Sequence, residues 1–453
     1  MKLYSITLFT ALASLSANCY SADILIEPGE GTIQAAINAA SSGDTLVLPS
    51  GSYSTYSSQS NQIVFDKALT VRAESGESVV HINASILTDP NLSEPLDYLR
   101  FQGVNLTPGG RCFGGYRAEI SVNNLELLEV TSSCLNGLTL DAENEVTVIG
   151  SYIGIGFSIN AKKATVLGST IVEYGGVMSV NADETNFIGN EVTTYNVNTR
   201  GIIFSGNNSG GQFVAANRFN YRLTYGPSSD YQQSESKKTF SLIKSYGSND
   251  NKSVYKNNVF KIDLTNFTDF TDAGTLERIS LLATHAGHDY FYNNVFDLAG
   301  LAIAQPASPS DDLGPMIAGQ LGAFMGNAII NYNDDVLGSN VNENAQYNLG
   351  FNNKEQLNVD SNNVNADPLF NADYSLKDGS PAIDAGPVDE YASDIDLTRN
   401  DIGVYGGSWN IGQYDVQRAP GATGPFIYPV LDAQAGIANG ELKLKLISYP
   451  RLK

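Results

Sequence analysis

One four-residue unit recurs through the middle of the chain: a small residue or Asn, then Ser or Asn, then any residue, then an apolar residue. Successive units begin 18, 21, 27, 41, 36 and 33 residues apart. A repeat of this length cannot bury its own hydrophobic side, so successive repeats must stack to build one continuous core. The polar second residues would then form a side-chain ladder at the same turn of every coil. The units read GSYI at 150, GSTI at 168, GNEV at 189, ANRF at 216, NNVF at 257, NNVF at 293 and GNAI at 326.

The residues between these units favour short strands. β-Branched runs such as EVTVIG and ATVLGS precede the units and are separated by Gly and Asn, which is typical of strands joined by tight turns. The sequence therefore predicts an all-β fold, a right-handed parallel β-helix, that is, a solenoid. A β-sandwich of hairpins stays open as the alternative. Hairpins, however, do not require an Asn-x-apolar unit that recurs at each turn.

The two ends of the chain carry distinct segments. GTIQAAINAASSGDTLVLPSGSY (31–53) predicts a short amphipathic helix that caps the first coil, followed by a strand. This segment resembles the opening of the pectate-lyase-like β-helix superfamily. DPLFNADYSLKDGSPAIDAG (367–386) and DIDLTRNDIGVYGG (394–407) resemble the closing motif of secreted bacterial β-helix proteins of the choice-of-anchor type. We therefore expect a signal peptide at 1–22, the β-helix at 23–365 and a closing segment with terminal strands at 366–453.

The N-terminus is typical of a secretory signal peptide. Lys2 precedes an apolar run, and small residues follow, so we expect cleavage near Ser21 or Ala22 and a secreted protein. A lipoprotein anchor at Cys19 is the alternative. After the signal, no apolar stretch approaches the roughly 20 residues of a membrane helix. Cys112 and Cys134 then remain, 22 residues apart or about one coil, and predict a disulfide between adjacent coils; two separate thiols are the alternative.

The charge is strongly negative and unevenly distributed. The formal net charge of −22 argues against nucleic acid or an anionic membrane as the general partner. The stretch from 216 to 261, however, contains eight basic residues and only three acidic ones. An acidic polysaccharide could bind this basic stretch while the remaining surface repels it.

Long intervals between later units indicate insertions near 221–238, 262–276 and 302–320. Insertions on successive repeats tend to line one face, which is often the binding face. We expect substrate contacts from aromatic and basic side chains of these insertions, with local packing of the loops as the alternative for the aromatic residues, and from Tyr290 in the coil that carries His285 and His288. The predicted substrate-binding residues are Arg222, Tyr225, Tyr231, Lys237, Lys238 and Tyr290.

FSLIKSYGSNDNKSVYKNNVF (240–260) and ISLLATHAGHDYFYNNVFD (279–297) resemble the chondroitinase B and alginate lyase family of β-helix enzymes. The resemblance implies β-elimination of a uronic-acid polymer, with Lys244 at the position of the catalytic lysine. The chain has Thr284 where the family has an arginine before His-Gly, so His285 or His288 would supply the acid. It has Thr239 and Phe240 where the family has a calcium-binding Glu.

Other functions stay open. A noncatalytic secreted or surface β-helix could bind glycan or serve an adhesive role. A polygalacturonase-type glycosidase needs converging carboxylates, and the adjacent Asp pairs at 311–312 and 334–335 lack that family's context. Asp394, Asp396 and Asp401 offer alternating oxygen ligands for calcium, or they close a structural turn. We expect a monomer with no cofactor other than calcium.

Overall fold

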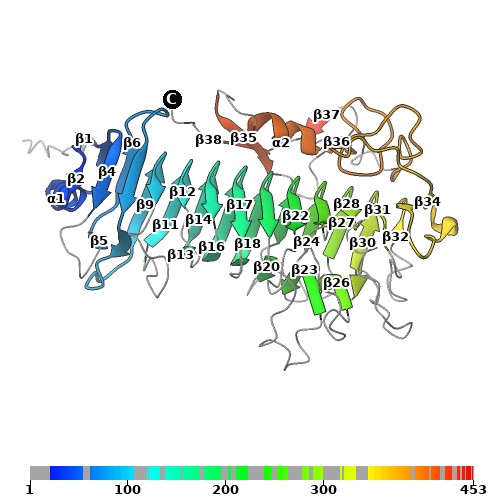
Figure 1. The fold of residues 1–453 in the computed structure, drawn as a ribbon, viewed down its shortest axis with the longest axis horizontal. Helices are drawn as coiled ribbons and strands as arrows, with labels where there is room; N and C mark the ends of the chain where they lie inside the picture. Colours follow the sequence, from blue (N-terminus) through cyan, green and yellow to red (C-terminus); the bar gives the residue numbers. More distant parts are fainter. Residues whose placement is uncertain are drawn as a thin grey trace, which may run out of the picture.

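The computed structural model forms a single long solenoid (Figure 1). The structure describes residues 21–54, 62–106, 120, 122–132, 138–154, 157–173, 178–194, 202–205, 211–222, 239–246, 252–263, 278–284, 289–298, 317–318, 321–332, 345–388, 393–407, 410–418, 424–430, 436–438, 441–443, 445–449 and 451.

Three sheet faces wind around a common core, and every pairing within them is parallel. We name them faces A, B and C. Face A contains β1 (Asp23–Leu25), β3 (Thr45–Leu48), β6 (Leu69–Ala73), β9 (Leu96–Gln102), β11 (Val122–Leu128), β14 (Glu145–Ile149), the second halves of β16 (Phe157–Leu167) and β18 (Met178–Ile188), β21 (Gln212–Ala215), β24 (Ser253–Lys256), β27 (Asp289–Tyr292), β30 (Leu321–Met325) and β32 (Ala345–Gln346).

Face B is a separate sheet that follows face A around each coil. It contains β2 (Gly29–Glu30), β4 (Gly51–Ser54), β7 (Val80–Asn83), β10 (Asn105–Leu106), β12 (Thr131–Ser132), β15 (Tyr152–Gly154), β17 (Thr170–Glu173), β19 (Glu191–Thr194), β22 (Arg218–Arg222), β25 (Val259–Asp263), β28 (Val295–Asp297), β31 (Ala328–Ile330), β33 (Leu349–Phe351) and β34 (Val364–Asn365).

Face C begins later in the chain and lies on the lower side of Figure 1. It contains β13 (Leu138–Asp141), the first halves of β16 and β18, β20 (Ile202–Ser205), β23 (Thr239–Tyr246), β26 (Arg278–Thr284) and β29 (Ile317–Ala318). A further parallel pair joins β5 (Gln62–Phe65) to β8 (Ser85–Thr88). The parallel pairing confirms the predicted β-helix and is incompatible with a sandwich of antiparallel hairpins.

The repeated unit forms the corner between faces A and B. Its first residue has a φ between +54° and +69° in all seven units, the left-handed region that favours Gly and Asn. Its polar second residue is at most 2% exposed, and its apolar fourth residue points into the core. Three successive fourth residues, Phe219, Phe260 and Phe296, stack with ring centroids 4.9 Å apart.

The predicted ladder is present and runs inside this corner. The Asn258 side chain accepts hydrogen bonds from the backbone N–H (3.0 Å) and Nδ2 (2.9 Å) of Asn217. Its own Nδ2 donates to the Val214 carbonyl (2.9 Å) and to Asn294 Oδ1 (3.0 Å). The same pattern repeats between neighbouring coils, so each amide pairs with the coils on both sides. The column comprises Ser151, Ser169, Asn190, Asn217, Asn258, Asn294, Asn327, Asn348 and Asn363.

At the N-terminal end lies the short helix α1 (Thr32–Ala39), where the sequence predicts a helix. Ile33 and Ile37 on one side of α1 are buried in the main core. The Gln34 side chain both donates to and accepts from the backbone of Val64 on β5, at 3.0 and 2.8 Å. These contacts join α1 to the solenoid.

The C-terminal part of the chain turns back along the outside of the A–B corner (Figure 1). An outward-facing row of apolar residues at this corner, including Ile149, Leu167 and Ile188, is buried beneath it. The segment contributes buried side chains of its own, among them Ile402 and Ile411. The 3-10 turn Val359–Ser361 precedes β34 at the end of the solenoid, and the elements of the C-terminal segment (366–453) are α2 (Ile411–Arg418), β35 (Phe426–Val430), β36 (Gly436–Ala438), β37 (Glu441–Lys443) and β38 (Lys445–Tyr449).

Asparagines at the first position of the repeated unit fasten this segment. Asn257 Nδ2 donates to the carbonyls of Val404 (3.0 Å) and Gly406 (2.7 Å). Asn293 Nδ2 donates to Asn400 Oδ1 (2.8 Å) and to the Asp401 carbonyl (2.7 Å). The two asparagines of NNVF therefore make different contacts. The first donates hydrogen bonds to the C-terminal segment, and the second belongs to the ladder inside the corner.

Tyr414 on α2 anchors the helix to the solenoid. Its side chain is 2% exposed and packs over Gly189, where an added Cβ would lie 3.0 Å from the ring. Because a buried aromatic ring is lost, Tyr414→Ala is expected to weaken docking of α2 by roughly 3–5 kcal/mol. Limited proteolysis should then cut the 410–418 region faster, whereas Tyr414→Phe should keep the wild-type rate. Equal protection in Tyr414→Ala would contradict this packing.

Candidate functional site: the outer side of face C

Face C carries a row of hydrogen-bonded polar side chains on its outer side. Asn160 Nδ2 donates to Asp141 Oδ1 (2.6 Å), and Asn181 Nδ2 lies 3.4 Å from Asn160 Oδ1. Ser205 Oγ continues the row at 3.4 Å from Asn181 Oδ1. All four residues are half-buried, while the alternating residues Leu140, Ile159, Val180 and Phe204 are buried in the core. Face C therefore has an apolar inner side and a polar outer side.

A second polar column lies beside the first. Ser158 Oγ and Ser179 Oγ are 2.9 Å apart and half-buried. Strand pairing continues the register position of Ser179, though not its polar character, to Ile203 and from Ile203 to Lys244. The backbone of Lys244 thus occupies, two coils further along, the same register position as Ser179.

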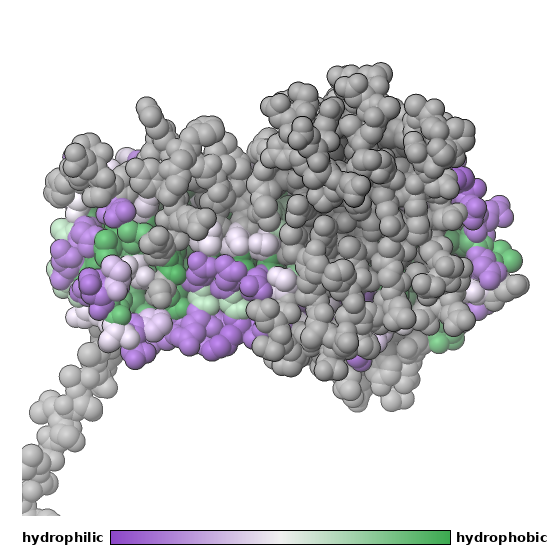
Figure 2. All heavy atoms as spheres, turned by 90° about the horizontal axis from the view of Figure 1, so that it is seen from below, coloured by the Kyte–Doolittle hydropathy of each residue, from purple (hydrophilic) through white to green (hydrophobic). Residues whose placement is uncertain are grey.

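These two columns offer both donors and acceptors. Hydroxyl groups can serve as either, and amides provide both in fixed positions. Because neighbouring strands are about 4.8 Å apart, the groups repeat at that interval along the solenoid. Figure 2 views the molecule from below Figure 1, and on the coloured part of that surface hydrophilic residues form bands that alternate with hydrophobic patches. Such an array suits an extended ligand rich in hydroxyl groups.

The other predicted substrate-binding residues that the structure describes lie on neighbouring faces. Arg222 is exposed at the end of β22 on face B. Tyr290 is half-buried on β27 of face A, with Lys252 Nζ 5.7 Å from its ring centroid. No single face therefore carries Arg222, Lys244 and Tyr290 together. The remaining predicted residues lie outside the described part of the chain: Tyr225, Tyr231, Lys237, Lys238, His285, His288, Cys112 and Cys134.

The loop predicted to bind calcium uses its carboxylates to close turns. Asp394 is buried and accepts hydrogen bonds from the backbone N–H groups of Asp401 (3.0 Å) and Gly407. Asp396 accepts from the backbone N–H and the hydroxyl of Thr398, and Asp401 from the N–H of Asp384. Among the described residues, no group of three or more His, Cys, Asp or Glu side chains is placed to hold a metal ion. These bonds account for the three carboxylates as turn-forming groups, and calcium at this loop stays a prediction.

Burial changes the acid–base properties of this loop. The pKa of Asp394 is raised from 3.8 to about 7, mainly because burial disfavours the charged carboxylate. The neighbouring Asp401 and Asp396 carboxylates contribute to this rise, and the two backbone hydrogen bonds oppose it. Burial also lowers the pKa of Lys256, the last residue of β24, while attraction to Asp394 opposes that shift.

We expect the Asp394 carboxyl to titrate near pH 7 in the folded chain. Its folded pKa lies above its unfolded value, so the folded state binds the proton more tightly. Its contribution to stability is therefore full below about 3.8 and is lost as the pH rises to about 7. Carboxyl-carbon NMR titration measures this midpoint, with the exposed Asp396 as an internal comparison. A midpoint for Asp394 at or below 3.8 would contradict the buried placement.

Sequence reasoning missed the polar row on face C. Asp141, Asn160, Asn181 and Ser205 are 19, 21 and 24 residues apart, which is close to the spacing of the corner units in the same region. A search for polar residues at these spacings, started from positions other than the corner unit, would have found this row. No short motif marks it, because its residue types differ from coil to coil.

No described helix is long and apolar enough to span a membrane. No protein-family model matches the sequence, and no curated protein matches it. Among solved structures, the crystal structure of pectate lyase Pel9A matches 84% of this chain and 96% of that chain, with 11% sequence identity and a TM-score of 0.32. The parallel β-helix is established by the strand pairing of this chain itself.

Proposed function

We propose that this protein is a secreted bacterial polysaccharide lyase that cleaves a uronic-acid polymer by β-elimination on the outer side of face C. One observation carries the proposal: the backbone of Lys244 continues the column of Ser158 and Ser179. The lysine of the sequence motif thus belongs to the sheet whose outer side bears the polar rows.

The reaction needs a base, a charge stabiliser and an acid. Lys244 removes the proton next to the uronate carboxylate, after neighbouring cations lower its pKa. Lys237 and Lys238 supply positive charge near the developing negative charge. His285 or His288 protonates the leaving oxygen. Asn160 and Asn181 orient the polymer through its hydroxyl groups.

Secretion brings the enzyme to its polymer. Cleavage near Ser21 or Ala22 releases a mature chain into an oxidising compartment, where Cys112 and Cys134 form a disulfide. The segment beyond 365, which resembles the choice-of-anchor type, stabilises the β-helix through the contacts of Asn257 and Asn293.

A noncatalytic glycan-binding protein is the second candidate. It is favoured by the amides of Asn160 and Asn181, because such a row can bind sugar hydroxyls without any base.

Incubation with alginate, pectate and chondroitin separates the two candidates. A lyase is expected to generate unsaturated ends, which ultraviolet absorbance detects. Binding of one of these polymers without any absorbance change would support the second candidate instead. If the protein neither cleaves nor binds any acidic polymer of the panel, both candidates are wrong.

A further inference from the structure

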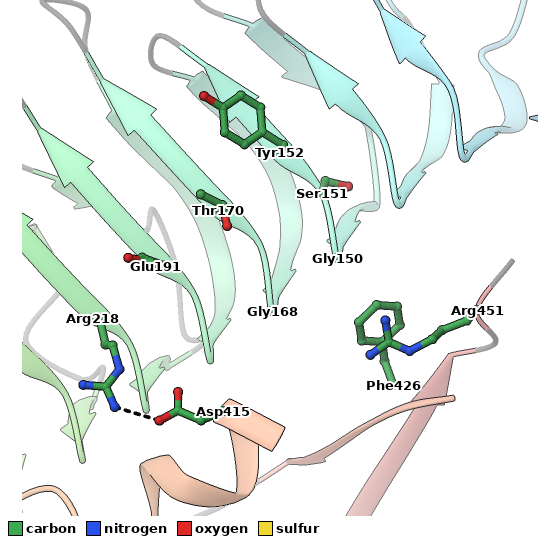
Figure 3. A pocket seen from close by; sticks show the side chains of 10 residues that line it. All are labelled: Gly150, Ser151, Tyr152, Gly168, Thr170, Glu191, Arg218, Asp415, Phe426 and Arg451. Carbon is green, nitrogen blue, oxygen red and sulfur yellow. Dashed lines mark hydrogen bonds and ion pairs between the residues drawn. The ribbon is translucent and has the colours of Figure 1, made fainter. Parts of the chain in front are cut away.

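A groove lies between the outer side of face B and the C-terminal segment. Its volume is about 450 Å³, within the range of about 300–1,000 Å³ usual for small-ligand sites. Side chains of four successive strands, β15, β17, β19 and β22, form one wall, and α2 and β35 form the other (Figure 3). The groove is on a different face from the rows of face C. Its lining side chains are Tyr152, Thr170, Glu191 and Arg218 on the first wall and Asp415, Phe426 and Arg451 on the second.

Strand register sets the spacing of the first wall. Tyr152 pairs with Thr170, Thr170 with Glu191, and Glu191 with Arg218. Each residue directly follows a ladder residue of the corner, so the rigid column within the core fixes its position. The four side chains therefore stand one coil apart, at the roughly 4.8 Å interval of paired strands.

Three of these side chains have unused hydrogen-bonding capacity. Tyr152 is 41% exposed and Glu191 is exposed on β19. Within the described part of the chain, the Tyr152 hydroxyl, the Thr170 hydroxyl and the Glu191 carboxylate make no hydrogen bond or ion pair. A large aromatic ring, a hydroxyl and a carboxylate thus border the groove and are available to a ligand.

The charged groups of the groove balance one another. Arg218 Nη2 lies 2.7 Å from Asp415 Oδ2 at one end, and the Arg451 guanidinium lies 3.6 Å from the centre of the Phe426 ring at the other. Two guanidinium groups and two carboxylates, Glu191 and Asp415, give no net charge. A polyanion would gain little here and would meet the exposed Glu191 carboxylate.

From this geometry we infer that the groove binds an uncharged oligosaccharide. Sugar hydroxyls can both donate and accept hydrogen bonds. They can therefore donate to the Glu191 carboxylate, accept from the Arg218 guanidinium, and do either with the Thr170 hydroxyl. The apolar face of a sugar ring packs on the Tyr152 ring, whose hydroxyl stays available for a hydrogen bond. A chain of sugars lies along the four strands, from Tyr152 towards the Arg218–Asp415 pair.

The site is independent of the lyase proposed above, since it uses face B and a neutral ligand. Its ligand would be an uncharged region of a longer polysaccharide. Loss of uronan cleavage would leave this binding intact, and failure of this binding would leave uronan cleavage intact.

Titration calorimetry with cellohexaose, laminarihexaose and xylohexaose tests the inference, with hexagalacturonate as the charged comparison. We expect at least one neutral hexasaccharide to bind. Tyr152→Ala should raise its dissociation constant roughly tenfold, because the ring contact is lost. Glu191→Gln, which keeps the size of the side chain, should weaken binding through the lost charge-assisted hydrogen bond.

Lys261→Ala provides the matched control, since Lys261 is exposed on face B beyond the groove and should leave binding unchanged. Thermal unfolding of each variant verifies folding, which these exposed positions should not disturb. Absence of binding to all three neutral hexasaccharides would overturn the inference, as would binding that neither Tyr152→Ala nor Glu191→Gln weakens.

Discussion

Lys244→Ala is expected to lower the rate of uronan cleavage by roughly 10²–10⁴-fold, the range that a positioned general base contributes. The substitution removes the only group that the proposed mechanism assigns to proton abstraction. Lys244→Arg should lose a similar factor, because a guanidinium keeps its proton at any pH at which the protein is folded. The Arg variant therefore separates loss of the base from loss of positive charge.

The matched control for this prediction is Lys261→Ala. Lys261 is exposed on β25 of face B, so its removal changes the net charge equally without touching face C. Cleavage is followed by ultraviolet absorbance on the most reactive polymer of the panel. Wild-type rates in Lys244→Ala would rule out this lysine as the base, whatever other residues contribute.

Asn258→Ala is expected to destabilise the solenoid by about 3–5 kcal/mol. Four hydrogen bonds of the fully buried Asn258 side chain disappear, and the Val214 carbonyl and the Asn217 backbone N–H lose partners in the core. Buried polar groups without partners cost more than the average hydrogen bond contributes. The substitution also interrupts the amide column between two coils.

Urea unfolding followed by circular dichroism measures this loss. Asn220→Ala serves as the control, because Asn220 is half-buried on the outer side of β22 and its loss should change stability by less than about 0.5 kcal/mol. Asn258→Ser should recover part of the loss, since Ser169 in the same column accepts the Ser151 N–H at 3.2 Å. If Asn258→Ala unfolds at the same urea concentration as Asn220→Ala, the ladder contributes no stability.

Much of the fold was predictable because the corner chemistry is local. A left-handed residue, a buried amide and an apolar residue must follow one another at each turn, and that order is visible in NNVF and GNAI. The course of the C-terminal segment was not visible. Ile149, Leu167 and Ile188 are outward-facing, yet in the sequence they look like ordinary strand ends.

The hydrogen bonds of Asn257 and Asn293 to the C-terminal segment could not be predicted either. Their backbone conformation can be inferred from residue type, whereas their hydrogen bonds reach residues more than 100 positions away. Such partners depend on how the C-terminal segment packs, which no local pattern records.

The candidate site was only partly predictable. The motif around Lys244 pointed to one strand, and strand register then joined that strand to Ser158 and Ser179 on face C. Arg222 and Tyr290 lie on faces B and A, because strands that follow each other closely in the chain turn through a corner between faces. Proximity in sequence therefore overstated how many of these residues share one surface.

A crystal structure of the wild-type chain with a bound uronan product tests the central claim most directly. We predict that the sugar chain lies on the outer side of face C, across Ser179 and Asn181, with Lys244 Nζ at the cleaved end. A product bound on face A or B, or a Lys244 side chain directed into the core, would contradict the account.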